Sequence, residues 1–200
     1  VYGAALAADR TKIIVLDDDP TGVQTVHDVF VYTDWKPNTL REAFEDGNKV
    51  SFLLTNSRGL TAAQTERVHR EIASAIHQAA QSCKRAVAVI SRSDSTLRGH
   101  YPLETETLRK AFEELGEQKF DGEILMPFFE DGGRYTIENV HYVASRDQLV
   151  PAGQTEFARD KTFGYQNSDL CRWVEEKTCG AFPAGEVLTV SLRELRTMDY

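Results

Sequence analysis

The sequence has no long apolar run and no basic-then-apolar start, so its 200 residues predict neither a membrane span nor an export signal. Basic residues are outnumbered by acidic ones, with 23 Lys and Arg against 31 Asp and Glu. The formal net charge of -8 argues against binding to nucleic acid or to an anionic membrane, because such surfaces concentrate Lys and Arg. The three cysteines, Cys83, Cys171 and Cys179, are few, odd in number and without metal-ligand spacing. They favour a reduced, cytoplasmic setting over a disulfide framework.

The common nucleotide-binding motifs are missing as well. Neither Gly-x-x-x-x-Gly-Lys-Ser/Thr nor Gly-x-Gly-x-x-Gly occurs in the sequence. His27, His100 and His141 lack the spacing of metal ligands, and no metal site is predicted. Any anion that the chain binds is therefore expected in a local cluster of polar residues.

The composition that remains, with 41% apolar and 27% charged residues, is typical of a folded globular chain. Short apolar runs rich in β-branched residues alternate with helical stretches. This pattern predicts an α/β fold, a three-layer α/β/α domain with a largely parallel sheet. The expected strands are Lys12–Leu16, Asp28–Thr33, Val50–Thr55, Ala86–Ser91, Glu123–Met126 and Glu186–Val190. The expected helices are Thr61–Ser82, which opens on a capping-box pattern, Pro102–Leu115 and Ser168–Thr178.

Residues 12–200 are expected to form one domain, because around 150 residues already suffice for an ordinary core, and residues 1–11 resemble a tail. The last stretch begins a helix at Leu192–Arg196 and then stops without a cap. We therefore expect a fragment of a longer polypeptide, with a frayed natural terminus as the alternative.

A first polar cluster, Asp17-Asp18-Asp19-Pro20-Thr21-Gly22, follows the first expected strand, where α/β sheets gather their ligand-binding loops. Three consecutive carboxylates repel one another, so burying them requires a cation, a hydroxyl-rich ligand or several amide donors. The alternative is a solvated turn that one Asp caps and Pro-Thr-Gly bends. A capped turn needs only one carboxylate, and we favour a binding site.

Two further clusters also follow expected strands. Thr55-Asn56-Ser57-Arg58-Gly59 can hold an oxyanion near a helix N-terminus or can simply cap the next helix. In the stretch from Ser91 to His100, Arg92 and Arg98 flank Asp94. Such a set can clamp a substrate carboxylate while Asp94 accepts a hydroxyl proton. The alternative is an Asp94–Arg98 ion pair that braces the loop.

Together these segments resemble the N-terminal domain of the four-carbon acid sugar kinases. The family pattern is Asp-Asp-x-Thr-Gly after an early strand, then Ser-Arg after a later strand, then Lys/Arg-x-Asp-Ser-Thr-x-Arg-Gly. The chain has Asp18-Asp19-Pro20-Thr21-Gly22 (or the overlapping Asp17-Asp18 start), Ser57-Arg58, and Arg92-Ser93-Asp94-Ser95-Thr96-Leu97-Arg98-Gly99. The resemblance extends from about Lys12 to Thr178.

The resemblance implies a kinase that transfers the γ-phosphoryl group of ATP to a hydroxyl of a four-carbon sugar acid of the threonate, erythronate or oxo-tetronate class. ATP and Mg²⁺ would be held mainly by a C-terminal nucleotide-binding domain that these residues do not contain. The expected partners are thus a small sugar acid and that missing domain, and a homodimer is compatible with the sequence. We expect the chain alone to bind sugar acid without kinase activity.

The resemblance also implies roles for single residues. Asp18, Asp19 or Asp94 would orient or deprotonate the attacking hydroxyl. The expected substrate-binding residues are Asp17, Thr21, Gly22, Ser57, Arg58, Arg92, Ser95, Arg98 and Gly99. The additional Asp and the Pro of the first motif, and an Arg where many members have Lys at position 92, leave the identity of the sugar acid open.

Two other functions fit parts of the sequence. Asp17-x-Asp19-x-Thr21 after an apolar strand also matches the nucleophile motif of haloacid-dehalogenase-type phosphatases, with Thr55 or Ser57 as the second-motif hydroxyl. That family needs a later lysine and an acidic pair at a strand end, and no convincing pair follows Lys119. The other alternative is a sugar-acid-binding module without catalysis, which would share the fold and the pocket.

Overall fold

The computed structural model describes residue 3 and residues 9–116 and 119–197. The chain divides into two compact units. The first unit comprises Val1–Asp94 and Gly99–Glu123, and the second comprises Ser95–Arg98 and Ile124–Tyr200. Most of the expected tail lies outside the described residues, and the single domain over residues 12–200 stays a prediction.

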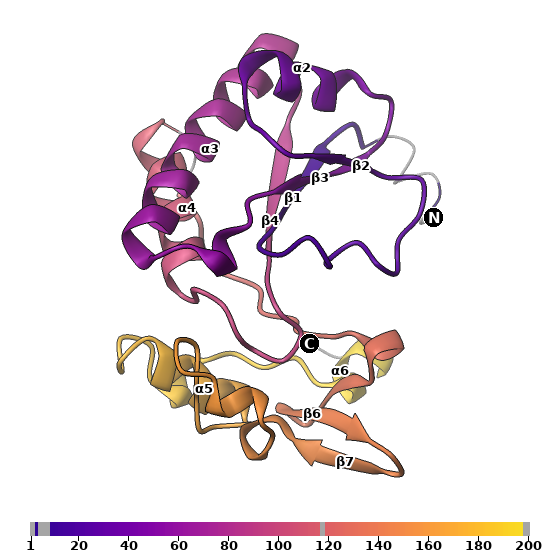
Figure 1. Ribbon diagram of the computed structural model, residues 1–200, viewed down its shortest axis with the longest axis vertical. Coiled ribbons are helices and arrows are strands. Elements are labelled where there is room, and N and C mark those ends of the chain that lie inside the picture. The colour runs from indigo at the N-terminus through magenta and orange to yellow at the C-terminus, as the bar shows by residue number, and fades with distance from the viewer. Residues whose placement is uncertain (1–2, 4–8, 117–118, 198–200) are drawn as a thin grey trace. The chain divides into compact units, whose positions relative to one another are not determined.

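A parallel four-stranded sheet organises the first unit (Figure 1). Its strands are β1 (Lys12–Asp17), β2 (Phe30–Tyr32), β3 (Val50–Leu54) and β4 (Val87–Arg92), in the order β2-β3-β1-β4. The register places Asp17 of β1 opposite Leu54 on one side and Arg92 on the other. All four strands therefore end at the same edge, and the predicted α/β class with a largely parallel sheet is confirmed.

Three helices accompany this sheet: α2 (Pro37–Glu45), α3 (Ala62–Cys83) and α4 (Leu103–Glu114). The capping box predicted for α3 is present, with the Thr61 side chain accepting from the Gln64 amide and the Gln64 side chain from the Thr61 amide. Helix α4 starts one residue later than expected, with Pro102 as its N-cap. Helix α2 was not predicted, although Pro37 in its first turn and the buried Leu40 and Phe44 are typical helix signals.

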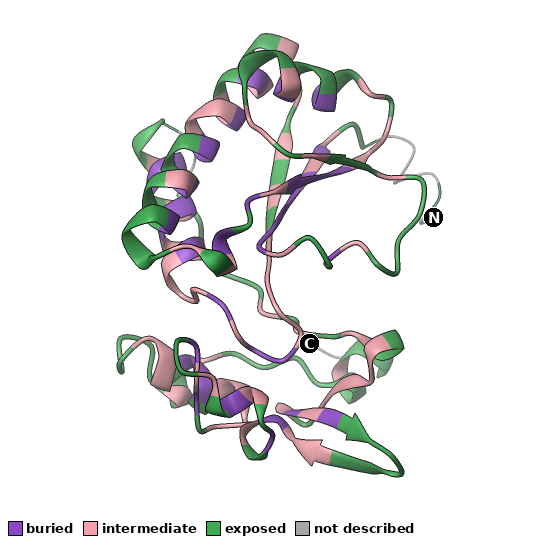
Figure 2. Cartoon of the chain, viewed as in Figure 1, coloured by how far each residue is buried: buried purple, intermediate pink, exposed green. Residues whose placement is uncertain are grey.

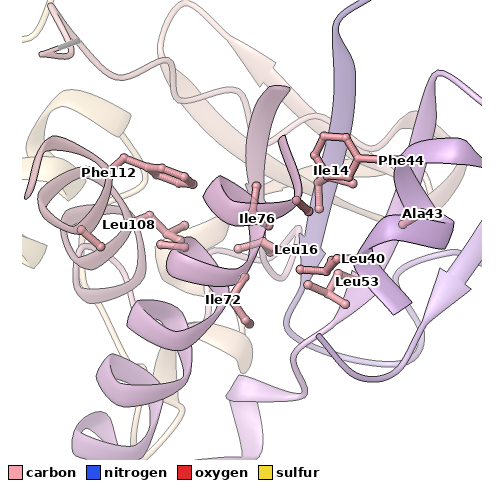
Figure 3. Close-up of a cluster of buried hydrophobic side chains, with 13 residues drawn as sticks. Ile14, Leu16, Leu40, Ala43, Phe44, Leu53, Ile72, Ile76, Leu108 and Phe112 are labelled. Carbon is pink, nitrogen blue, oxygen red and sulfur yellow. The ribbon is translucent and has the colours of Figure 1, made fainter. Parts of the chain in front are cut away.

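The core lies where these helices meet one face of the sheet. Alternate residues of β1, Ile14 and Leu16, point into it, as does Leu53 of β3 (Figure 3). Its buried side chains are Ile14, Leu16, Leu40, Ala43, Phe44, Leu53, Ile72, Ala73, Ile76, Ala79, Leu108, Ala111 and Phe112. Each large member contributes about 1.5–3 kcal/mol to folding, so this layer fixes the sheet on which the site is built.

The amino end of β1 carries a buried ion pair. The Lys12 ammonium, fully buried, donates to Asp46 Oδ1 at 2.8 Å, the Asn48 carbonyl at 2.9 Å and Ser51 Oγ at 2.7 Å. These contacts use all three of its hydrogens. Asp46 in turn accepts from the Ser51 hydroxyl at 2.6 Å and from the Asn48 amide at 2.8 Å.

The second unit contains an antiparallel meander. Its strands are β5 (Arg134–Ile137), β6 (Val140–Ser145) and β7 (Gln148–Pro151), paired in that order. Glu138 and Asn139, with φ of 48° and 69°, form the two-residue turn between β5 and β6, as in favoured hairpins. The helices of this unit are α5 (Leu170–Lys177) and the short α6 (Leu192–Thr197), both where the sequence predicted them. Buried segments occur in each unit, as Figure 2 shows.

Five single-turn 3-10 helices complete the described elements. They are η1 (Ser57–Gly59), η2 (Glu130–Gly132), η3 (Ala152–Gln154), η4 (Phe157–Arg159) and η5 (Ala184–Glu186). No helix among the described residues is long and apolar enough to span a membrane.

Two expected strands are wrong. Glu123–Met126 lies outside any helix or strand, with 94% of Ile124 and 79% of Met126 exposed. In Glu186–Val190, the first residue ends η5 and the other four form no strand. An apolar run predicts burial, but a strand also needs a neighbour with which to share backbone hydrogen bonds, and sequence periodicity does not name that neighbour.

Candidate functional site

The loops after β1, β3 and β4 meet at the carboxyl edge of the sheet in the first unit. The Asp18 amide donates to the Arg92 carbonyl at 3.3 Å, and the Thr55 amide donates to the Asp17 carbonyl at 2.9 Å. The Arg58 amide donates to the Asp18 carbonyl at 3.2 Å. These bonds continue the strand ladders into the loops and place the side chains of positions 17–19, 58 and 92 close together.

Arg58 and Asp18 form a bidentate ion pair. Arg58 Nε donates to Asp18 Oδ2 at 2.9 Å, and Nη2 donates to Oδ1 at 2.7 Å. The Asp18 side chain is 2% exposed and the Arg58 side chain 22%, so the aspartate is buried while part of the arginine stays accessible. Arg58 Nη1 also lies 3.4 Å from Asp19 Oδ2. Two segments that are 40 residues apart thus share one charge network.

Arg92 and Asp17 form the second pair. Arg92 Nη1 donates to Asp17 Oδ1 at 3.1 Å. Burial raises the pKa of Asp17, against the opposing charge of Arg92, and the neighbouring charge of Asp18 adds to the rise. Gly22 lies directly against this pair: a Cβ there would fall 1.8 Å from Asp17 Oδ2 and 2.2 Å from Arg92 Nη1. Glycine is therefore required at this position of the Thr-Gly motif, because the Asp17 and Arg92 side chains approach its backbone closely.

Asp19 is the most exposed of the three consecutive aspartates, with 26% of its side chain accessible. Its Oδ1 accepts from the Thr21 amide at 2.8 Å and from the Thr21 hydroxyl. The Thr21 hydroxyl lowers the pKa of Asp19, and the charge of Arg58 contributes to the same shift. The turn thus keeps an ionised carboxylate at the accessible side of the edge.

The start of the third polar cluster joins the same network. The Ser93 hydroxyl donates to Asp18 Oδ2 at 2.9 Å. Gly99, with φ of 140°, lies against Ser93, since a Cβ there would come 2.0 Å from Ser93 Oγ. Burial lowers the pKa of Arg58, but the Asp18 hydrogen bond and the charges of Asp18 and Asp94 outweigh it and raise that pKa. Ser93 was not among the predicted site residues.

Ser57 lies beneath this edge, fully buried. Its hydroxyl oxygen lies 2.5 Å from Glu104 Oε1 of α4 and 3.0 Å from Thr55 Oγ1. The Ser57 hydroxyl therefore supports the loop from inside. Glu104 and its neighbour His69 were missed by the sequence analysis. The available signal was a histidine on the buried stripe of α3, between Thr65 and Ile72.

The remaining two predicted residues, Ser95 and Arg98, belong to the second unit. The Ser95 carbonyl accepts from His141 Nε2 at 2.7 Å. Arg98 Nε donates to Thr96 Oγ1 at 3.1 Å, and its guanidinium lies 5.0 Å from the centre of the Phe157 ring. The other ten predicted site residues belong to the first unit, whereas Ser95 and Arg98 belong to the second.

We call Asp17, Asp18, Asp19, Arg58 and Arg92 the carboxyl-edge cluster. It contains three carboxylates and two guanidinium groups, and the charge of Asp94 also acts on Arg58. Carboxylates accept hydrogen bonds from hydroxyls, and guanidinium groups match carboxylates in a planar fork. Within residues 9–116 and 119–197, no group of three or more His, Cys, Asp or Glu side chains has the geometry to hold a metal ion. The cluster thus suits a ligand with hydroxyls and one acid group.

Comparison with known proteins agrees with this chemistry. The sequence model of a family described as "sugar-binding N-terminal domain" matches residues 13–197. No curated protein matches the chain. A similar solved structure is a domain of unknown function from Bordetella bronchiseptica, a domain-swapped dimer with bound citrate. It has 23% sequence identity and a TM-score of 0.59.

That likeness covers 81% of this chain and 39% of the Bordetella chain, so this chain spans well under half the length of that protein. At such low identity the likeness shows the fold alone. The family match, by contrast, covers nearly the whole sequence and confirms the resemblance to the N-terminal domain of the four-carbon acid sugar kinases. The chain belongs to the family of sugar-binding N-terminal domains.

Proposed function

We propose that the carboxyl-edge cluster binds a four-carbon sugar acid. The observation that carries this proposal is the convergence of Arg58 and Arg92, both partly exposed, on aspartates that outnumber them. A sugar acid offers one carboxylate for the guanidinium groups and several hydroxyls for the carboxylates. The citrate bound to the Bordetella protein is a hydroxy acid, which supports the same ligand chemistry.

We further propose that the bound sugar acid is the acceptor in an ATP-dependent phosphoryl transfer. ATP would supply the phosphoryl group and Mg²⁺ would neutralise its charge. The sequence has no glycine-rich nucleotide motif, so we assign the nucleotide to residues outside these 200. The part of this chain is to hold the acceptor and to orient one hydroxyl, which supplies much of the catalysis in such reactions.

Among the three expected catalytic carboxylates, Asp19 has the best-supported role. It is more exposed than Asp18, and the Thr21 hydroxyl and amide hold it in place as an ionised group. Asp18 is committed to Arg58 through both of its oxygens. We therefore assign hydroxyl orientation to Asp19 and positioning of Arg58 to Asp18.

Titration calorimetry of the chain with threonate and erythronate tests the binding step. Threitol lacks the acid group and succinate lacks the hydroxyls, so both serve as matched controls. We expect each control to bind at least about tenfold more weakly than the better sugar acid, the contribution of about one charged hydrogen bond. Equal affinity for threonate and succinate would contradict hydroxyl recognition by the aspartates.

The phosphatase alternative has less support. The motif would make Asp17 a nucleophile, but its side chain is 3% exposed and is paired with Arg92 beneath Gly22. Phosphatase activity that is lost in Asp17→Asn would nevertheless revive this alternative.

A non-catalytic binding module is distinguished by the full-length protein: sugar-acid-dependent ATP consumption supports the kinase, and binding without consumption supports the module. The swapped dimer of the Bordetella protein supports a test for a homodimer by light scattering.

A further inference from the structure

A buried polar chain runs below the Arg58 loop, entirely within the first unit. It begins at His69 of α3, whose exposure is 1%, and continues to Glu104 of α4, whose exposure is 3%. His69 Nε2 lies 3.7 Å from Glu104 Oε1, and the same oxygen is 2.5 Å from the Ser57 hydroxyl. The chain ends at Thr55, whose hydroxyl is 3.0 Å from both Ser57 Oγ and the Asp17 carbonyl.

If all three oxygen-to-oxygen contacts in this chain are hydrogen bonds, they need a proton beyond those of the two hydroxyls. Three oxygen-to-oxygen contacts join Glu104, Ser57, Thr55 and the Asp17 carbonyl, but the two hydroxyls supply only two hydrogens. A protonated Glu104 supplies the third. Glu104 then donates to Ser57, Ser57 donates to Thr55, and Thr55 donates to the carbonyl.

The contacts of His69 lead to the same conclusion. Its Nδ1 lies 2.8 Å from the Thr65 carbonyl, so Nδ1 carries a hydrogen. If Nε2 is neutral and Glu104 is ionised, an unpaired carboxylate charge is buried, which is costly. One proton held by the pair, on either partner, removes that charge or balances it.

The ionisable groups that face Glu104 are His69 on α3, Asp18 after β1 and His100 ahead of α4. Burial raises the pKa of Glu104, the charge of His69 opposes the rise, and the charge of Asp18 adds to it. Because Asp18 belongs to the carboxyl-edge cluster, the pair and the site act on each other electrostatically.

We propose that Glu104 and His69 are a proton-sharing positioning pair for the Arg58 loop. Ser57 begins the single turn η1, and its hydroxyl is the attachment point of that turn to α4. The next residue, Arg58, holds Asp18, so the position of the guanidinium depends on the Glu104 contact. The effect on sugar-acid affinity rests on the proposed function, whereas the effect on the loop does not.

Two substitutions at one position test the pair. Glu104→Gln keeps a side chain that both donates and accepts, without a charge, and Glu104→Leu keeps the volume but removes the hydrogen bond. Glu113→Leu on the same helix is the control, because the Glu113 carboxylate is salt-bridged to the partly exposed Arg109 at 3.1 Å. The first readout is hydrogen exchange of the Arg58 amide, bonded to the Asp18 carbonyl, and of the Leu60 amide, bonded to the Ser57 carbonyl.

In Glu104→Leu we expect exchange of these two amides to accelerate about tenfold or more, the equivalent of losing about one hydrogen bond. Strand β1 amides should change no more than they do in Glu113→Leu. Glu104→Gln should restore slow exchange at both positions. Acceleration throughout β1 and α3 would overturn the positioning role, and so would unchanged exchange in the loop.

The second readout is threonate affinity measured as a function of pH, because burial raises the pKa of Glu104. We expect Glu104→Leu to bind about tenfold more weakly than the wild type. Glu104→Gln should bind within about threefold of the wild type and lose the pH dependence that the wild type shows. A pH dependence retained in Glu104→Gln would overturn the shared proton. If the wild type binds no sugar acid but the loop exchanges as expected, the proposed function fails and the positioning pair stands.

Discussion

The two ends of strand β1 carry charged clusters with opposite characters. At the amino end, one buried ammonium, Lys12, faces one buried carboxylate, Asp46, and all three ammonium hydrogens have acceptors. At the carboxyl end, three aspartates share two arginines whose side chains remain 22% and 31% exposed. A cluster that is balanced, saturated and closed stabilises the fold, whereas one that is unbalanced and accessible is able to exchange partners with a ligand.

The largest expected effect tests the amino end. Lys12→Met leaves Asp46 buried without its cation, which should lower the free energy of unfolding by about 3–5 kcal/mol in denaturant titrations. Sugar-acid affinity, measured where the variant is still folded, should match the wild type. The double variant Lys12→Met/Asp46→Leu should recover part of the loss. A fall in affinity with Lys12→Met would erase the distinction between the two ends.

The matched change at the carboxyl end is Arg58→Met. Affinity for the sugar acid should fall about 100-fold, as expected when one partner of a hydrogen-bonded charge pair is removed. The free energy of unfolding should fall by less than in Lys12→Met, because Arg58 is partly exposed and water can reach the vacated position. Wild-type affinity in Arg58→Met, measured by calorimetry, would remove this residue from the site.

A smaller effect is expected at Gly22. In Gly22→Ala the new Cβ must displace the Asp17 carboxylate and the Arg92 guanidinium, and affinity should fall about tenfold. Gly59→Ala is the control, since a Cβ at Gly59 meets nothing within 4 Å. Equal affinities of the two alanine variants would show that the Asp17–Arg92 geometry is irrelevant to binding.

The smallest effect concerns pH. Burial raises the pKa of Asp17, so the folded chain binds this proton more tightly than the unfolded chain. The stability that this proton provides is complete below the ordinary value of 3.8 and is lost as the pH rises through the folded-state pKa. Asp17→Asn lacks this loss. The free energy of unfolding of Asp17→Asn, relative to that of the wild type, should therefore increase as the pH rises. The increase should be less than about 1 kcal/mol, because Arg92 loses its partner in the variant.

Thermal unfolding across that pH range measures the difference. If the stability of Asp17→Asn relative to the wild type instead falls as the pH rises, the attraction between Asp17 and Arg92 outweighs the cost of burying the Asp17 charge.

The sequence predicted most of the first unit because its signals are local. The apolar run before Asp17 and the Thr61 capping box each determine a structure within a few residues. The convergence of Asp18 and Arg58 was also predictable, since parallel strands bring their following loops to one edge. Helix α2 was not predicted, although Leu40 and Phe44 are spaced four residues apart, as on one face of a helix.

Other features depend on contacts that a sequence does not specify. Ser57 was predicted to face the ligand, and its complete burial against Glu104 depends on how α4 packs. The strand expected at Glu123–Met126 lacks a pairing partner among the described strands. A sequence pattern predicts which side chains are buried, but their hydrogen-bond partners are determined only by how the chain folds.

The most direct measurement of the central claim is the titration of threonate into isotopically labelled protein, monitored through the arginine Nε–Hε resonances in NMR spectra. The Arg58 and Arg92 resonances should shift together and saturate at the calorimetric affinity, because both guanidinium groups exchange part of their contact with aspartate for the ligand carboxylate. Saturable threonate binding that leaves both resonances in place would contradict the assignment of the sugar-acid site to the carboxyl-edge cluster.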